Sequence, residues 1–133
     1  MSRAAVLSRL RMYGWPAWGA VVLFFSTAPA GWILGAAPPS TWSWLSALGH
    51  VVESGVFAAL LAWSGAAWTR GRARLLRIAL VGLAFGLAVE LIQLPIPYRS
   101  FDLRDWAADA AGIAAVLVLV RLGEREAARG RPG

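Results

Sequence analysis

The side chains best suited to chemistry in this chain are carboxylates, a histidine, a glutamine and an arginine. They are His50, Glu53, Glu90, Gln93, Arg99, Asp102, Asp105 and Asp109. A carboxylate in a low-dielectric environment, or a histidine near neutral pH, can act as a general acid or base. An arginine can grip a phosphate or a carboxylate through two parallel hydrogen bonds. The set therefore predicts acid–base chemistry or binding at a site for an amphiphilic molecule.

The spacing of these residues places them on shared helix faces. His50 lies three residues before Glu53, and Glu90 lies three residues before Gln93. The three aspartates follow one another at intervals of three and four residues. Side chains three or four positions apart are neighbours on a helix surface. Each group is therefore expected to project from one face of its own helix.

The composition indicates that these helices lie in a membrane. Of the 133 residues, 59% are hydrophobic and only 15% are charged, whereas a soluble domain carries about 25% charged residues. A globule of this size has too little interior to bury so much apolar surface. The chain has no cysteine, which excludes disulfides, thiolate nucleophiles and cysteine-ligated metals. The net charge of +6 does not indicate nucleic-acid binding, because the basic residues lie in short segments between apolar stretches.

Four apolar stretches predict an all-α membrane bundle of four transmembrane helices in one domain, residues 1–133. A bilayer core requires roughly 20 apolar residues in a helix. The expected helices cover about residues 15–34, 47–68, 78–94 and 103–122. The third and fourth are short, and the fourth carries Asp109. The polar tail, residues 123–133, is expected to fray.

The distribution of arginines predicts the orientation. Eleven of the thirteen basic residues would lie on one side of the membrane if all four helices span it. Basic loops remain in the cytoplasm, so both termini are expected inside. Arg99 and Arg104 would then lie outside. An alternative for the start of the chain is a signal peptide with a cleavage site at Ala28-Pro29-Ala30, although the apolar stretch is longer than usual for one.

This orientation places the polar side chains at one depth. His50 and Glu53 would lie one to two turns below the outer surface, and Glu90 and Asp109 about one turn below it. Charged side chains that face lipid cost several kcal/mol, so these faces are expected to turn inward. The sequence therefore predicts a polar site in the outer leaflet, between the second, third and fourth helices.

Structural roles explain some of these residues equally well. Asp102 can be the N-cap of the fourth helix, with Asp105 favoured in its first turn by the helix dipole. Arg99 can be a counter-ion for a buried carboxylate. His50 can be an interhelical hydrogen bonder. These roles leave unexplained why so many ionisable groups share one layer.

Two motifs resemble those of the VanZ-like family of bacterial membrane proteins. The longer is Glu90-x-x-Gln93 followed by Arg99-x-x-Asp102-x-x-Asp105-x-x-x-Asp109-x-x-Gly112, and the shorter is His50-x-x-Glu53. The resemblance covers about residues 45–115. It implies a multi-pass protein of the bacterial plasma membrane, in a family named for a protein that raises resistance to the glycopeptide teicoplanin. It implies no settled reaction.

The chain departs from the family pattern at two places. The segment before His50 is Ser46-Ala47-Leu48-Gly49, where the family often has charge or lysine. The family usually has asparagine where this chain has Asp109, which adds a carboxylate and leaves any role of a neutral amide there in doubt.

Two hypotheses for function follow. In the first, the protein is an enzyme or a lipid-binding protein at the outer leaflet. Its substrate or ligand would be a lipid-linked cell-envelope precursor or a phospholipid. Its acid–base residues would be His50, Glu53, Glu90, Asp105 and Asp109. Gln93, Arg99 and Asp102 would bind the substrate. In the second, the charges form a structural network in a non-catalytic envelope protein.

Other functions have less support. A transporter is disfavoured because four helices form a small pathway and no inverted repeat is visible. No spacing matches a known metal motif, so the sequence predicts no metal and no other cofactor, although carboxylates with His50 leave a divalent cation open. The substrate and the oligomeric state are not determined by the sequence.

Overall fold

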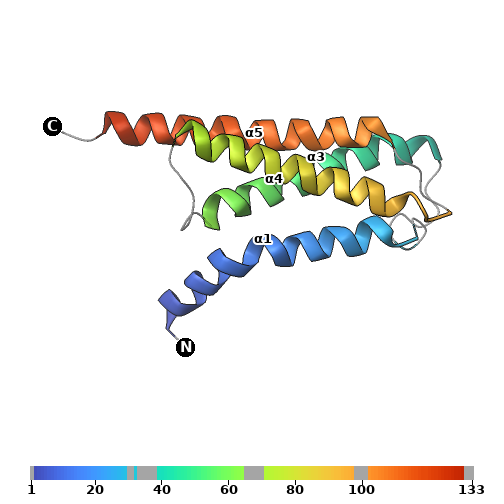
Figure 1. The fold of residues 1–133 in the computed structure, drawn as a ribbon, viewed down its shortest axis with the longest axis horizontal. Helices are drawn as coiled ribbons and strands as arrows, with labels where there is room; N and C mark the ends of the chain where they lie inside the picture. Colours follow the sequence, from blue (N-terminus) through green and yellow to red (C-terminus); the bar gives the residue numbers. More distant parts are fainter. Residues whose placement is uncertain (1, 30–31, 33–38, 65–70, 98–101, 131–133) are drawn as a thin grey trace.

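The described residues of the chain form four α-helices that alternate in direction (Figure 1). The structure is a computed structural model that describes residues 2–29, 32, 39–64, 71–97 and 102–130. The helices are α1 (Arg3–Thr27), α3 (Pro39–Ser64), α4 (Arg72–Gln93) and α5 (Leu103–Arg129). The start of α1 and the end of α5 lie at one end of the bundle, and the starts of α3 and α5 lie at the other. The predicted all-α fold class is confirmed.

Three of the described helical segments are long and apolar enough to cross a bilayer. They are Leu45–Ser64, Arg72–Gln93 and Leu103–Arg129, with 20, 22 and 27 residues. The chain is therefore a multi-pass membrane protein. The first helix is not in this group; it contains Arg3, Arg9, Arg11 and Pro16. Three of the four predicted spans are supported, and α1 remains a predicted span.

The first helix differs from its expected bounds. It begins at Arg3, where the hydroxyl of Ser2 accepts a hydrogen bond from the backbone N–H of Ala5 at 3.3 Å, a typical N-cap. It ends at Thr27, whereas the predicted span ran from residue 15 to residue 34. The hydropathy pattern locates the apolar part of a helix and misses its polar turns, since backbone hydrogen bonding does not require apolar side chains.

The last helix also extends beyond its expected end. It continues past residue 122 to Arg129, so the prediction of a frayed tail is wrong for this part of the chain. Glu124 stabilises the extension, because its carboxylate pairs with Arg74 of α4 at 3.1 Å and with Arg121 one turn earlier at 3.7 Å. Partly exposed pairs of this kind contribute modestly.

The apolar core lies among all four helices. Phe57, Leu61, Ile78 and Ile113 are almost fully buried. The ring of Phe57 stacks on Phe85 with centroids 4.4 Å apart and an interplanar angle of 5°. Large apolar side chains are also widely exposed, while a few charged and amide side chains are buried. The buried set includes Glu90, Gln93 and Asp109. This distribution is the reverse of that in a soluble protein and suits a lipid solvent.

Glycines allow α3, α4 and α5 to approach one another closely. A Cβ atom at Gly112 of α5 would overlap the backbone oxygen of Val51 of α3. A Cβ atom at Gly86 of α4 would lie 2.5 Å from a carboxylate oxygen of Asp109, and one at Gly82 would lie 2.8 Å from Ile113. Small residues serve this purpose in membrane bundles, because backbone proximity increases van der Waals contact. The same close approach brings the polar side chains of the three helices together.

Candidate functional site

His50 of α3 lies between two aspartates of α5. Its Nδ1 atom is 3.2 Å from Oδ1 of Asp109, and its Nε2 atom is 3.5 Å from Oδ2 of Asp105. The aspartates are four residues apart and therefore lie on one face of α5. Asp109 is 5% exposed, and the His50 side chain is 14% exposed. The prediction that His50 forms an interhelical hydrogen bond is confirmed.

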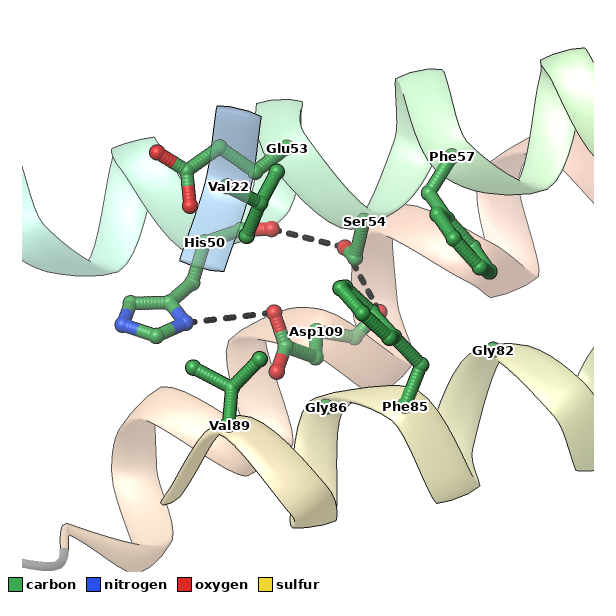
Figure 2. A pocket seen from close by; sticks show the side chains of 10 residues that line it. All are labelled: Val22, His50, Glu53, Ser54, Phe57, Gly82, Phe85, Gly86, Val89 and Asp109. Atoms are coloured by element: carbon green, nitrogen blue, oxygen red, sulfur yellow. Dashed lines mark hydrogen bonds and ion pairs between the residues drawn. The ribbon is translucent and has the colours of Figure 1, made fainter. Parts of the chain in front are cut away.

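Ser54 adds a second polar connection between the same two helices. Its hydroxyl lies 2.7 Å from the carbonyl oxygen of His50 and 3.0 Å from that of Asp109. The single hydroxyl proton can be donated to either acceptor. Figure 2 shows both contacts beside the imidazole–carboxylate pair. Ser54 thus stabilises the segment of backbone that holds the imidazole against Asp109.

Glu90 of α4 is the most deeply buried acid of the site. It is 1% exposed, and its Oε2 atom accepts a hydrogen bond from the backbone N–H of Asp102 at 3.1 Å. Its Oε1 atom has no hydrogen-bond partner among the residues that the structure describes. A buried acceptor without a donor is costly, so this oxygen has unused capacity for a ligand.

Asp102 starts α5. Its Oδ1 atom accepts a hydrogen bond from the backbone N–H of Arg104 at 2.8 Å, and its own backbone is extended. The predicted N-cap role is confirmed, with Asp105 in the first turn. Asp105 is partly exposed and lies 3.5 Å from the hydroxyl of Ser46, at the limit of a hydrogen bond. Arg104 is exposed.

Gln93 has a different neighbourhood from the carboxylates. Its amide nitrogen donates to the backbone oxygen of Ser26 at 2.8 Å, which ties α4 to α1. Both residues are buried. The structure therefore gives Gln93 a structural contact, and its substrate-binding role remains a prediction. Arg99, the other predicted substrate-binding residue besides Asp102, lies outside the described residues.

A small pocket opens beside the His50–Asp109 pair. Its lining comes from all four helices, with Val22 from α1, Phe85 from α4 and Glu53 from α3. Figure 2 shows apolar rings and aliphatic side chains around the polar pair. The backbone oxygen of Glu53 also accepts a hydrogen bond from the indole N–H of Trp18 at 3.0 Å. The first helix thus contributes packing and an indole donor to the surroundings of the site.

Five of the predicted site residues come together, and some contributors were missed. His50, Glu90, Asp102, Asp105 and Asp109 lie in one connected group. Sequence reasoning missed Ser54 and Gly86. Ser54 lies four residues after His50 and hence on the same helix face. Gly86 lies four residues before Glu90, and only the distance to Asp109 reveals its role.

Three side chains of this group could hold a metal ion. His50, Glu90 and Asp105 each offer one ligand atom, and these atoms all lie within 4.8 Å of one another. They come from α3, α4 and α5, so the arrangement exists only in the folded bundle. The group can also relay or hold protons, since an imidazole lies between two carboxylates.

The part of the chain that forms this site lies within a known protein family. The VanZ/LLP1 family profile matches residues 9–124, which covers most of the chain. The chain belongs to the VanZ/LLP1 family. The matched region includes the polar face of all three apolar helices and every residue of the group around His50. The resemblance inferred from the two motifs is thereby confirmed.

Family membership leaves the activity of this VanZ/LLP1 protein open. No curated protein and no solved structure matches the chain. The geometry of the polar group is therefore the main basis for a functional conclusion.

Proposed function

We propose that this VanZ/LLP1 protein binds or acts on an amphiphilic lipid at the polar site, with a phospholipid or a lipid-linked cell-envelope component as the ligand. One observation supports this most directly. Three apolar helices bring together an imidazole and three carboxylates, those of Glu90, Asp105 and Asp109, at one end of the bundle, and Glu90 and Asp109 are buried there. Ionisable groups at such a position are usually functional, because burial among apolar helices costs several kcal/mol.

The orientation follows from the distribution of charge. The start of α1, the beginning of α4 and the end of α5 carry most arginines and lie together at the end opposite the site (Figure 1). Positive charge favours the cytoplasm, so we place the site in the outer leaflet of a bacterial plasma membrane. An amphiphile in that leaflet would present its headgroup at the depth of His50.

The residues suit distinct roles in this proposal. Asp109 holds Nδ1 of His50, and Nε2 faces Asp105 at 3.5 Å, so in the metal-free site this nitrogen would serve as a general base. Arg99 would bind the phosphate of the headgroup. Glu90 and Asp105 would contact hydroxyl or amine groups, while Glu53 lines the adjoining pocket. A role in glycopeptide resistance is a further proposal, based on the family name.

Co-purified lipid tests the proposal. The wild-type chain, Arg99→Ala and Glu90→Gln would be purified in mild detergent, and bound lipids would be identified by mass spectrometry. We expect a defined lipid in near-stoichiometric amount with wild type and a loss of at least ten-fold in both variants. Glu124→Gln is the matched control, because it removes an ion-paired carboxylate at the other end of the bundle. Equal lipid content in all four proteins would contradict the proposal.

A structural role is the second candidate, and specific contacts favour it. Glu90 accepts a hydrogen bond from the start of α5, and Ser54 links α3 to α5. In this case the Glu90→Gln and Arg99→Ala variants would lose stability rather than a ligand. Removing one partner of a buried hydrogen bond costs about 1–3 kcal/mol. Melting of the purified variants in detergent separates the two functions.

A further inference from the structure

We propose that His50, Glu90 and Asp105 bind one divalent first-row transition-metal cation, such as Zn²⁺ or Mn²⁺. Their ligand atoms lie within 4.8 Å of one another. Metal–ligand bonds of about 2.0–2.2 Å bring the donor atoms of one ion to within about 4 Å. Modest side-chain rotation would therefore close the site around an ion. The inference stands on this geometry and holds whether or not a lipid binds nearby.

The orientation of the imidazole supports a metal at Nε2. With a proton on Nδ1, His50 donates to Asp109 at 3.2 Å, and its Nε2 lone pair then faces Oδ2 of Asp105 at 3.5 Å. In that tautomer a lone pair opposite an ionised carboxylate oxygen is repulsive, and a cation between them removes the repulsion, as a proton would. Metal-bound histidines commonly donate their other N–H to a carboxylate, which fixes the tautomer and the ring. In this site Asp109 is the carboxylate that accepts the hydrogen bond from Nδ1–H of His50.

Glu90 provides an independent observation. Its side chain is 1% exposed, and its Oε2 atom is occupied by the backbone N–H of Asp102. Its Oε1 atom is buried and has no donor among the described residues. Leaving a buried carboxylate oxygen without a partner is unfavourable. A cation held also by His50 and Asp105 would satisfy it.

The donor set and its charge indicate the class of ion. One imidazole nitrogen with two carboxylate oxygens suits Zn²⁺, Mn²⁺ or Fe²⁺, whereas Mg²⁺ and Ca²⁺ prefer oxygen ligands alone. Two carboxylates also balance the charge of a divalent ion in a low-dielectric environment. An ion with three protein ligands retains a position for water or for a phosphate oxygen. Such an ion would let an acidic site accept an anionic headgroup.

Metal content of the purified full chain is the direct measurement. A chelator would first remove any bound metal from the protein in detergent. The protein would then be incubated with Zn²⁺ or Mn²⁺ and desalted, and its metal content would be measured by elemental mass spectrometry. We expect about one ion per chain for wild type and for Glu124→Gln. We expect at least a ten-fold weaker affinity, by calorimetric titration, for His50→Gln and Asp105→Asn.

Two further measurements keep the test decisive if a variant fails to fold. Asp109→Asn keeps an acceptor for Nδ1–H, so this variant should still bind one ion per chain. Its metal affinity should fall by no more than about 100-fold, as expected when only an orienting partner is changed. Wild type loaded with Co²⁺ should show ligand-field absorption that Zn²⁺ displaces. The inference is overturned if wild type binds no more Zn²⁺ or Mn²⁺ than folded His50→Gln, or if Co²⁺ gives only its aqueous spectrum. Bound lipid without bound metal would overturn the metal site and leave the proposed function standing.

Discussion

The Oε2 atom of Glu90 in α4 accepts a hydrogen bond from the backbone N–H of Asp102, 3.1 Å away at the start of α5. A helix begins with backbone N–H groups that have no partner within the helix. A buried carboxylate on the neighbouring helix therefore completes the first turn of α5. The contact positions Asp105 and Asp109, because both follow Asp102 on the same helix.

Replacing Glu90 should separate its structural contact from its charge. Glu90→Gln keeps a side-chain oxygen that can accept from Asp102, whereas Glu90→Ala leaves that N–H without this acceptor. We expect Glu90→Ala to have a free energy of unfolding about 1–3 kcal/mol below that of Glu90→Gln. Circular dichroism during denaturation in mixed micelles measures the difference. Equal stability of the two variants would show that the hydrogen bond contributes nothing.

The contact of Gly112 with α3 predicts a strong effect of one methyl group. Gly112→Ala would place a Cβ atom onto the backbone oxygen of Val51 and force α3 and α5 apart. We expect a loss of about 1–3 kcal/mol in unfolding free energy, as for other overpacked sites. Gly123→Ala is the control, because no other atom lies within 4 Å of a Cβ atom built there. The prediction fails if both alanine variants melt alike.

The hydroxyl of Ser54 predicts a smaller effect. Ser54→Ala removes the hydrogen bond to the Asp109 carbonyl oxygen on α5. Interhelical hydrogen bonds in membranes contribute about 0.6 kcal/mol on average, so a loss near that size is expected from equilibrium unfolding. Ser64→Ala serves for comparison, since the hydroxyl of Ser64 bonds within its own helix to Leu61. A larger loss for Ser64→Ala would contradict the assignment.

The proposed orientation can be tested by cysteine labelling. Because the chain has no cysteine, a single introduced cysteine is the only thiol that a maleimide can label. Pro97 follows α4 at the site end, and Gly130 follows α5 at the opposite end; both are exposed. In intact cells, a membrane-impermeant maleimide should label Pro97→Cys, and it should label Gly130→Cys only after permeabilisation. The reverse pattern would place the site in the cytoplasmic leaflet and overturn the orientation.

The sequence by itself determined the class of protein and the chemistry available to it. Apolar stretches around His50, Glu90 and Asp109 predicted membrane helices with buried ionisable groups, because hydropathy and helical spacing are local properties. The N-cap role of Asp102 was predictable for the same reason. The bounds of α1 and α5 were not, since polar residues extend a helix without any hydropathy signal.

Only the tertiary structure decided which polar residues meet. The order of residues along the chain does not show that Gly86 and Gly112 bring three helices into close contact, that Asp109 orients His50, or that Gln93 is bonded to α1 instead. The burial of Glu90 with one unsatisfied oxygen is likewise a property of packing. These relationships depend on distances between residues far apart in the chain, which are set by how helix surfaces fit together.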